Sequence, residues 1–190
     1  MLDQQAMFNW AVEWCNKANV GYNQDYRNQQ VHDGVTYYDC SSFLFFACWL
    51  GGGYDMSLIG YSTDLNKYHN GEANAWVVHT MEEDLPTLGY TRYNMDEGTP
   101  QPGDIMVKTW EHTEICYSTS PFKTMGARSK NHPLDEQVAI HYSDLSYWDG
   151  FWRLGGEPPT PPGPGPVPPS ERKKMPLWMM IKPYRKYGIQ

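Results

Sequence analysis

The sequence predicts an α+β fold in which helices come first and an antiparallel sheet follows. Apolar residues recur at helical spacing over residues 3–19 and again after residue 40. From residue 90 onward, short segments rich in strand-forming residues alternate with turn signals. The 190 residues suffice for one domain of common size with extensions.

The helices are predicted before residue 90. Over residues 3–19 an apolar stripe that includes Met7, Trp10 and Trp14 is expected to face the core, and Gly21 follows the end of the helix. Residues 21–34 are polar and irregular in pattern, with a turn at Asp33-Gly34-Val35.

Three more helices are expected. Asp39 is a plausible N-cap for a helix that Gly51-Gly52-Gly53 ends. A short helix is predicted at residues 63–69. Thr80-Met81-Glu82-Glu83 resembles a capping box and predicts a helix that ends at Gly89.

The second half is predicted to be the sheet, with strands near residues 90–95, 104–109, 112–118, 122–128, 137–142 and 150–154. Trp110-Glu111 would form the bend between the second and third of these strands. Because side chains alternate along a strand, His112, Glu114 and Cys116 should share one face.

The chemistry is concentrated in one cysteine and one histidine. Cys40 lies in the run Tyr38-Asp39-Cys40-Ser41-Ser42-Phe43, where a loop turns into a helix. The unpaired N–H groups and partial positive charge of a helix N-terminus favour a thiolate. His112 opens a strand about seventy residues later, and an imidazole next to a thiol accepts its proton and delivers it to a leaving group.

These motifs resemble a known family. Tyr38-Asp39-Cys40-Ser41-Ser42 resembles the nucleophile motif of the NlpC-type and CHAP-type papain-like peptidoglycan hydrolases, in particular a phage-encoded subgroup. Pro100-Gln101-Pro102-Gly103-Asp104-Ile105 is similar to the turn before the histidine strand, and His112-Thr113-Glu114-Ile115 to the motif that carries the base. Met125-Gly126-Ala127-Arg128-Ser129 looks like the next strand of phage members, so the likeness spans roughly residues 1–154.

The resemblance implies a papain-like fold and thiol-dependent cleavage of an amide in the bacterial wall, either a peptide bond or the muramoyl–alanine link. Cys40 would be the nucleophile and His112 the base, with Tyr38, Asp39 and Ser41 as oxyanion or supporting residues. In such a fold residues 21–34 would lie near the cleft.

The sequence departs from the family at the residue that orients the imidazole. The matching stretch, residues 124–129, has no histidine and no carboxylate. The orienting residue is therefore Glu114, which we take as the first candidate, or Asn131 or Asp104, or the site works as a dyad. Arg128 is interpreted as a surface arginine, and His141 is an alternative base.

Two functions of other classes remain open. One is a binding or structural virion component that keeps the fold without the chemistry, and the other is an acyl transferase on the same scaffold. Nothing in the sequence predicts a cofactor, a metal or a nucleic-acid partner. The histidines lack zinc-site spacing, and Cys15, Cys40, Cys48 and Cys116 show no paired spacing, so free thiols are expected.

The domains are predicted as a catalytic domain over residues 1–155, a proline-rich linker over 156–170 and a basic tail over 171–190. The tail carries six basic residues against one acidic residue, while the whole chain has a net charge of −7. We expect the tail to bind an anionic membrane or wall surface or to dock on a virion protein, the remaining alternative being a disordered, solvated basic segment.

The first twenty residues show no signal peptide, and no run is long enough to span a membrane. A protein of this kind would be made in the host cytoplasm and act at the wall, as an endolysin or a virion-associated lysin.

Overall fold

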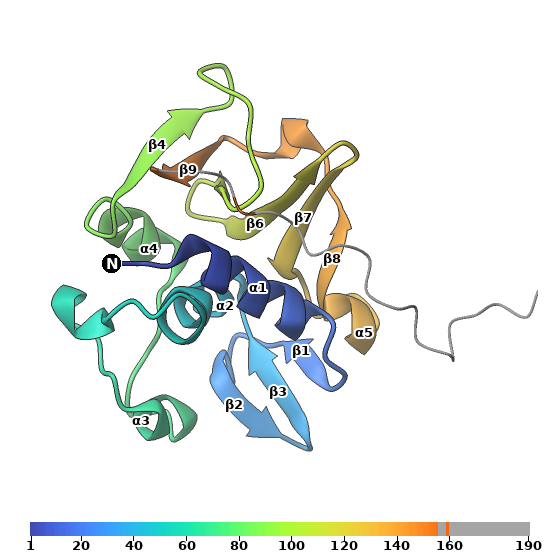
Figure 1. Ribbon diagram of the computed structural model, residues 1–190. Helices are drawn as coiled ribbons and strands as arrows, with labels where there is room; N and C mark the ends of the chain where they lie inside the picture. The colour runs from blue at the N-terminus through green and yellow to red at the C-terminus, as the bar shows by residue number, and fades with distance from the viewer. Residues whose placement is uncertain (156–158, 160–190) are drawn as a thin grey trace, which may run out of the picture.

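The chain folds as an α+β protein with two sheets, and α+β is the fold class that the sequence predicts (Figure 1). The computed structural model describes residues 1–155 and Pro159. The predicted linker (156–170, apart from Pro159) and basic tail (171–190) lie outside the described residues. In the described part of the chain, no helix combines the length and apolarity needed to cross a membrane.

The large sheet has six strands in the order β4-β9-β5-β6-β7-β8, and every neighbouring pair is antiparallel. All six strands were predicted, and every predicted bound lies within one residue of the observed one. These bounds are β4 (Tyr90–Asn94), β5 (Ile105–Lys108), β6 (His112–Thr119), β7 (Phe122–Ala127), β8 (Val138–Tyr142) and β9 (Gly150–Leu154). A hairpin whose bend contains Trp110 joins β5 to β6, and Lys108 pairs with His112 where the hairpin begins.

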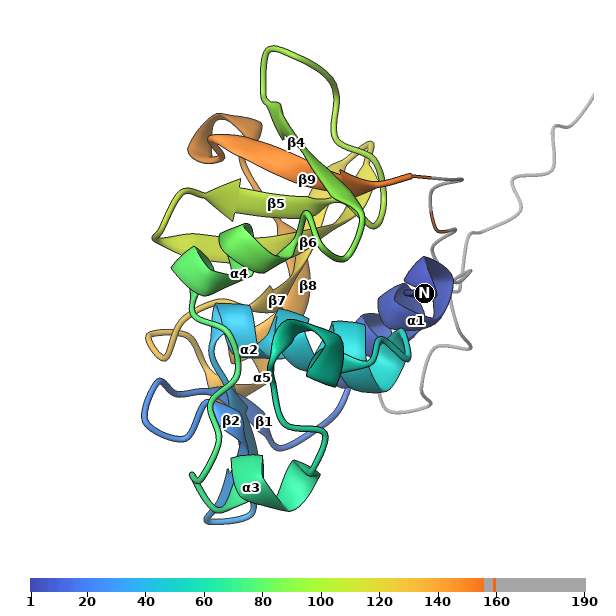
Figure 2. The ribbon, with the colours of Figure 1, turned by 90° about the vertical axis from the view of Figure 1, so that its left-hand side faces the viewer.

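A smaller three-stranded sheet lies at the opposite end of the molecule from β4 (Figures 1 and 2). It consists of β1 (Val20–Tyr22), β3 (Val35–Tyr38) and β2 (Asn28–His32), with β1 parallel and β2 antiparallel to β3. The predicted turn at residues 33–34 is correct, since Asp33 and Gly34 both have positive φ, as a tight hairpin turn requires.

The expectation that residues 21–34 are irregular is correct for residues 23–27 and wrong for the residues of β1 and β2. Strands β1 and β2 are short, and β2 is polar. A bulge at Gln29 also interrupts the register of β2, so apolar and polar residues do not alternate along it in the sequence. The pairing with β3 makes these residues strands.

Helix α1 (Gln4–Cys15) ends four residues before the predicted boundary. The side chain of Asn16 donates to the Val12 carbonyl, and Asn19 then adopts a positive φ that leads the chain into β1. Helix α2 (Cys40–Phe46) begins after Asp39 as predicted. It continues as a π-helical turn, η1 (Ala47–Gly51), which ends at the first of the three glycines.

The remaining elements are short. They are η2 (Met56–Ile59), α3 (Leu65–His69), α4 (Val78–Asp84), α5 (Leu134–Gln137) and η3 (Leu145–Tyr147). The predicted start of α4 was wrong: Thr80 is not its N-cap but lies in its first turn, where its hydroxyl accepts the Val77 N–H.

Helix α2 lies between the two sheets, and α1 packs beside it against β7 and β8 (Figure 2). The core between them is aromatic, with Phe8, Phe43, Phe45, Phe46 and Trp76 all fully buried. This packing holds the first residue of α2 against the end of the sheet at which β6 begins.

Candidate functional site

Cys40 is the first residue of α2 and is buried, with 7% of its surface exposed. Asp39 caps the helix by accepting the Ser42 N–H at 2.8 Å, and the Ser42 hydroxyl accepts the Asp39 N–H at 2.9 Å. This reciprocal cap fixes the backbone on both sides of the thiol.

The residues next to Cys40 are held in place by contacts with other segments. Asp39 forms an ion pair with Arg27, with Oδ2 and Nε 3.0 Å apart, and the Ser41 hydroxyl donates to the Trp76 carbonyl at 2.8 Å. Tyr38, expected as an oxyanion or supporting residue, has a fully buried ring, and its hydroxyl accepts from Gln29 at 2.6 Å. The phenol of Tyr38 therefore faces the core, because an aromatic ring at this position completes the packing of α1 and α2.

His112 is the first residue of β6, and its imidazole lies close enough to the Cys40 thiol for the thiol to help raise the imidazole pKa. The ring stacks on Trp148 with centroids 5.9 Å apart, which restricts its rotation. Burial acts to lower the pKa of His112, but the hydrogen bonds with Cys40 and Glu114 outweigh it and raise the pKa to about 10. The imidazole is therefore protonated at neutral pH.

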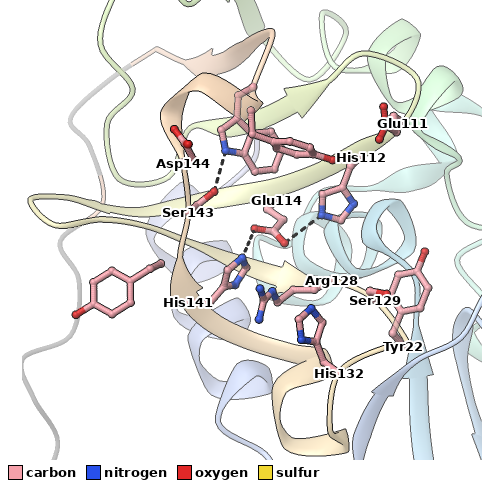
Figure 3. Close-up of a pocket in the computed structure, with 13 residues that line it drawn as sticks. Tyr22, Glu111, His112, Glu114, Arg128, Ser129, His132, His141, Ser143 and Asp144 are labelled. Atoms are coloured by element: carbon pink, nitrogen blue, oxygen red, sulfur yellow. Dashed lines mark hydrogen bonds and ion pairs between the residues drawn. The ribbon is translucent and has the colours of Figure 1, made fainter.

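Glu114 lies between two imidazoles (Figure 3). Its Oε1 is 3.1 Å from His112 Nε2, and its Oε2 is 3.2 Å from His141 Nε2 and accepts a short hydrogen bond from Thr124. Burial acts to raise the pKa of this carboxyl, but the hydrogen bonds from His112 and His141 lower it to about 2. Glu114, only 3% exposed, is thus a buried, ionised carboxylate with a partner at each oxygen.

Gly126 on β7 leaves the space that Glu114 occupies. A Cβ at position 126 would lie 3.2 Å from Glu114 Cγ, tighter than an ordinary contact. The family to which the sequence bears a resemblance has its orienting side chain on this strand. Here a glycine makes room for a carboxylate from the histidine strand itself.

The other two candidates for the orienting role are bound elsewhere. Asp104 forms a bidentate pair with Arg153, with distances of 2.6–3.2 Å, and caps the Gln101 N–H. Asn131 is exposed in the loop after β7 and lines a different cavity. Cys15, Cys48 and Cys116 are free and buried, and burial raises the pKa of each thiol.

Two cavities flank the Cys40–His112 pair. One, of about 370 Å³, is lined by Cys40, Gln24, Val77 and Trp110 among others. The second, of about 520 Å³, is lined by His112, Glu114, Tyr22 and Arg128 among others (Figure 3). Glu111 lines both, so the thiol and the imidazole lie where the two cavities meet.

Several residues of this cleft were not selected from the sequence. Burial raises the pKa of the Tyr22 phenol to about 12, and the proximity of Cys40 contributes to this increase. Gln24 lies beside Cys40 in the smaller cavity, and Trp110 is 71% exposed at its rim. The expected position of residues 21–34 near the cleft was the only signal for Tyr22 and Gln24.

Arg128, which we interpreted from the sequence as a surface arginine, is half-buried and also lines the larger cavity. Among the residues that the structure describes, no group of three His, Cys, Asp or Glu side chains has an arrangement that would hold a metal ion. The arrangement can activate a thiol, hold a proton on an imidazole and fix the orientation of that imidazole.

No protein-family model matches the sequence, and no curated protein emerges as a relative. One solved structure that is similar is a wild-type endolysin, LysIME-EF1, with 14% sequence identity and a TM-score of 0.43. The similarity covers 81% of this chain and 65% of the endolysin chain, so it spans less than two thirds of that protein.

Proposed function

We propose that this chain is a cysteine-dependent amide hydrolase of the phage type that cleaves bacterial peptidoglycan. The observation that carries the chemical part is the series of contacts from the Cys40 thiol to His112 and from His112 to Glu114. A buried structural cysteine has no need of a protonated imidazole that is held in turn by a buried carboxylate.

The contacts assign a role to each side chain. His112 Nε2 faces Glu114, which leaves Nδ1 for the thiol. The thiolate of Cys40 attacks the amide carbonyl carbon, and the imidazolium of His112 delivers its proton to the nitrogen as the C–N bond breaks. Glu114 stays ionised, keeps the ring in its orientation and stabilises the imidazolium.

The thioester left on Cys40 is then hydrolysed. His112, now neutral, removes a proton from water, and the oxygen of that water attacks the thioester carbonyl. The C–S bond of the thioester then breaks and the acid product leaves, while the proton taken from water stays on His112, which restores the starting Cys40–His112 pair. Asp39 and Ser41 act indirectly in both steps, because they fix the start of α2.

The substrate class rests on the sequence motifs, since Asp39-Cys40-Ser41-Ser42 and His112-Thr113-Glu114-Ile115 resemble those of papain-like wall hydrolases. The scissile bond is a peptide bond or the muramoyl–alanine amide. The protein acts at the cell wall as an endolysin or as part of a virion.

Two measurements test the proposal together. Wild-type protein should clear suspensions of purified Gram-positive walls, whereas Cys40→Ala and His112→Ala should lose this activity and Cys15→Ala should keep it. Iodoacetamide near neutral pH should alkylate Cys40 before Cys15, Cys48 or Cys116, because burial raises the pKa of those three thiols. Lysis by Cys40→Ala at the wild-type rate would exclude the proposal.

If the protein is instead a non-catalytic virion component with the same fold, both measurements should give the opposite result. It would leave walls intact and would give Cys40 no greater reactivity than the other three thiols. Release of transferred product only when an amine acceptor is added would instead identify an acyl transferase.

A further inference from the structure

The larger cavity beside His112 has a wall of cationic and basic side chains. Arg128, His132 and His141 lie together on one side of it, below the His112–Glu114 pair in the view of Figure 3. Two of its three acidic lining residues, Glu111 and Asp144, lie on the opposite side, and the third is Glu114. His132 pairs with Glu136 and His141 pairs with Glu114, so within the described chain Arg128 is the side chain that gives this side of the cavity an unpaired positive charge.

Arg128 is the cationic side chain on this side of the cavity that no carboxylate in the described part of the chain pairs with. Among the described residues its guanidinium has no ion pair, no side-chain hydrogen bond and no aromatic contact. By contrast, Arg27 pairs with Asp39 and Arg153 with Asp104. An acidic chain with a net charge of −7 thus leaves a partly buried arginine without a carboxylate, inside a cavity next to its reactive thiol.

The backbone around Arg128 is held in place. The Arg128 N–H donates to the Gln137 carbonyl at 2.8 Å. The Gln137 side chain donates to the His132 carbonyl at 3.0 Å and accepts the Tyr22 N–H at 2.8 Å. One glutamine therefore ties three lining residues of the cavity together, which is the preorganisation that a binding site needs.

Glu114 does not neutralise Arg128. Its two carboxylate oxygens are taken by His112 and by His141 with Thr124. The five N–H donors of the guanidinium remain available to a ligand, and their planar arrangement matches a carboxylate.

From these contacts we infer that Arg128 binds a free carboxylate of the substrate, one that lies close to the scissile amide. The substrate class is an acidic peptide, of which a wall stem peptide with γ-linked D-glutamate is an example. This inference rests on the proposed amide hydrolase function and adds its specificity. Arg128 is a binding residue and takes no part in proton transfer.

The test uses two synthetic muramoyl stem peptides that differ in one group. In one the γ-linked D-glutamate keeps its α-carboxylate, and in the other that group is a primary amide. Wild-type protein should have a KM at least tenfold lower for the acid than for the amide, because a charge-assisted hydrogen bond is lost in the amide.

Substitution at position 128 should remove this preference. Arg128→Ala should raise KM for the acid peptide roughly ten- to a hundredfold and leave kcat and the amide peptide nearly unchanged. Arg128→Lys should fall between the two, because lysine keeps the charge without the planar fork. Lys67→Ala, which removes a cation from α3 outside these cavities, is the matched control and should behave as wild type.

Binding to the inactive Cys40→Ala protein separates this inference from the proposed function. Calorimetry should show that Cys40→Ala binds the acid peptide more tightly than the amide, and that Cys40→Ala/Arg128→Ala does not. Equal affinity of Cys40→Ala for both peptides would overturn the carboxylate site even if walls are cleaved. A preference for the acid in a protein without hydrolytic activity would keep the site and exclude the proposed function.

Discussion

Glu114 and His112 lie two residues apart on the same strand, and a carboxylate oxygen of the first is 3.1 Å from the second's Nε2. A straight strand directs residues i and i+2 to one face, so the pair needs no contribution from a neighbouring strand. The partner strand supplies space at Gly126 and a hydroxyl at Thr124. The orienting group of this site is therefore local in sequence.

Replacing Glu114 by glutamine removes the charge and keeps the shape. We expect kcat on walls to fall roughly 10²- to 10⁴-fold, because the imidazolium loses both its stabilisation and its fixed orientation. Turbidity and peptide-release assays measure the effect. Glu13→Gln, an exposed change on α1, should not alter activity, and a Glu114→Gln enzyme within threefold of wild type would refute the orienting role.

The pH dependence of kcat/KM should reflect the raised pKa of His112. The imidazolium is the form that protonates the leaving amine, so activity should persist through neutral pH and fall as pH rises through about 10. Since Glu114 is one cause of the raised pKa, the descending limb of the Glu114→Gln variant should lie at lower pH. Superimposable limbs for the two proteins would contradict this assignment.

The same pair should make stability depend on pH. The lowered pKa of Glu114 contributes stability above its ordinary value of 4.5, which is lost as pH falls toward about 2. The raised pKa of His112 contributes below 6.5 and is lost as pH rises through about 10. The difference in melting temperature between wild type and Glu114→Gln should therefore be largest at pH 4.5–6.5, and a difference that does not vary with pH would argue against the coupling.

Gly126→Ala tests the space that Glu114 occupies. The added Cβ would lie 3.2 Å from Glu114 Cγ, so the carboxylate has to shift by a few tenths of an ångström from His112 and His141. Gly126 also has a φ of +158°, which residues with a side chain rarely adopt, so we expect about a tenfold loss of kcat together with a lower melting temperature. Ala139→Ser, a change on the strand that pairs with Gly126, serves as the control, and unchanged kcat in Gly126→Ala would show that the fit is loose.

Asp39 combines a helix cap with a partly buried ion pair to Arg27. Asp39→Ala removes both and leaves Arg27 without its carboxylate, so unfolding should become easier by about 3–5 kcal/mol. Asp39→Asn keeps the cap and should cost less. Asp55→Ala, at the exposed cap of η2, should have a much smaller effect, and equal effects of Asp39→Ala and Asp55→Ala in thermal unfolding would contradict this reasoning.

The sequence by itself determined the elements that periodicity and turn residues encode. The six strands of the large sheet, the cap at Asp39 and the positions of Cys40 and His112 at the start of their elements all follow from local pattern. Glu114 was selected because alternation along one strand is a local property. The small sheet escaped prediction, because the polar strand β2 exists only through its pairing with β3.

Only the tertiary structure decided how these elements meet. It brought Cys40 next to His112 across about seventy residues, placed His141 on the second oxygen of Glu114, and placed Arg128 in the wall of a cavity. The reason is that contacts between distant segments depend on the order and register of strands in the sheet, and no pattern within a single segment encodes that register.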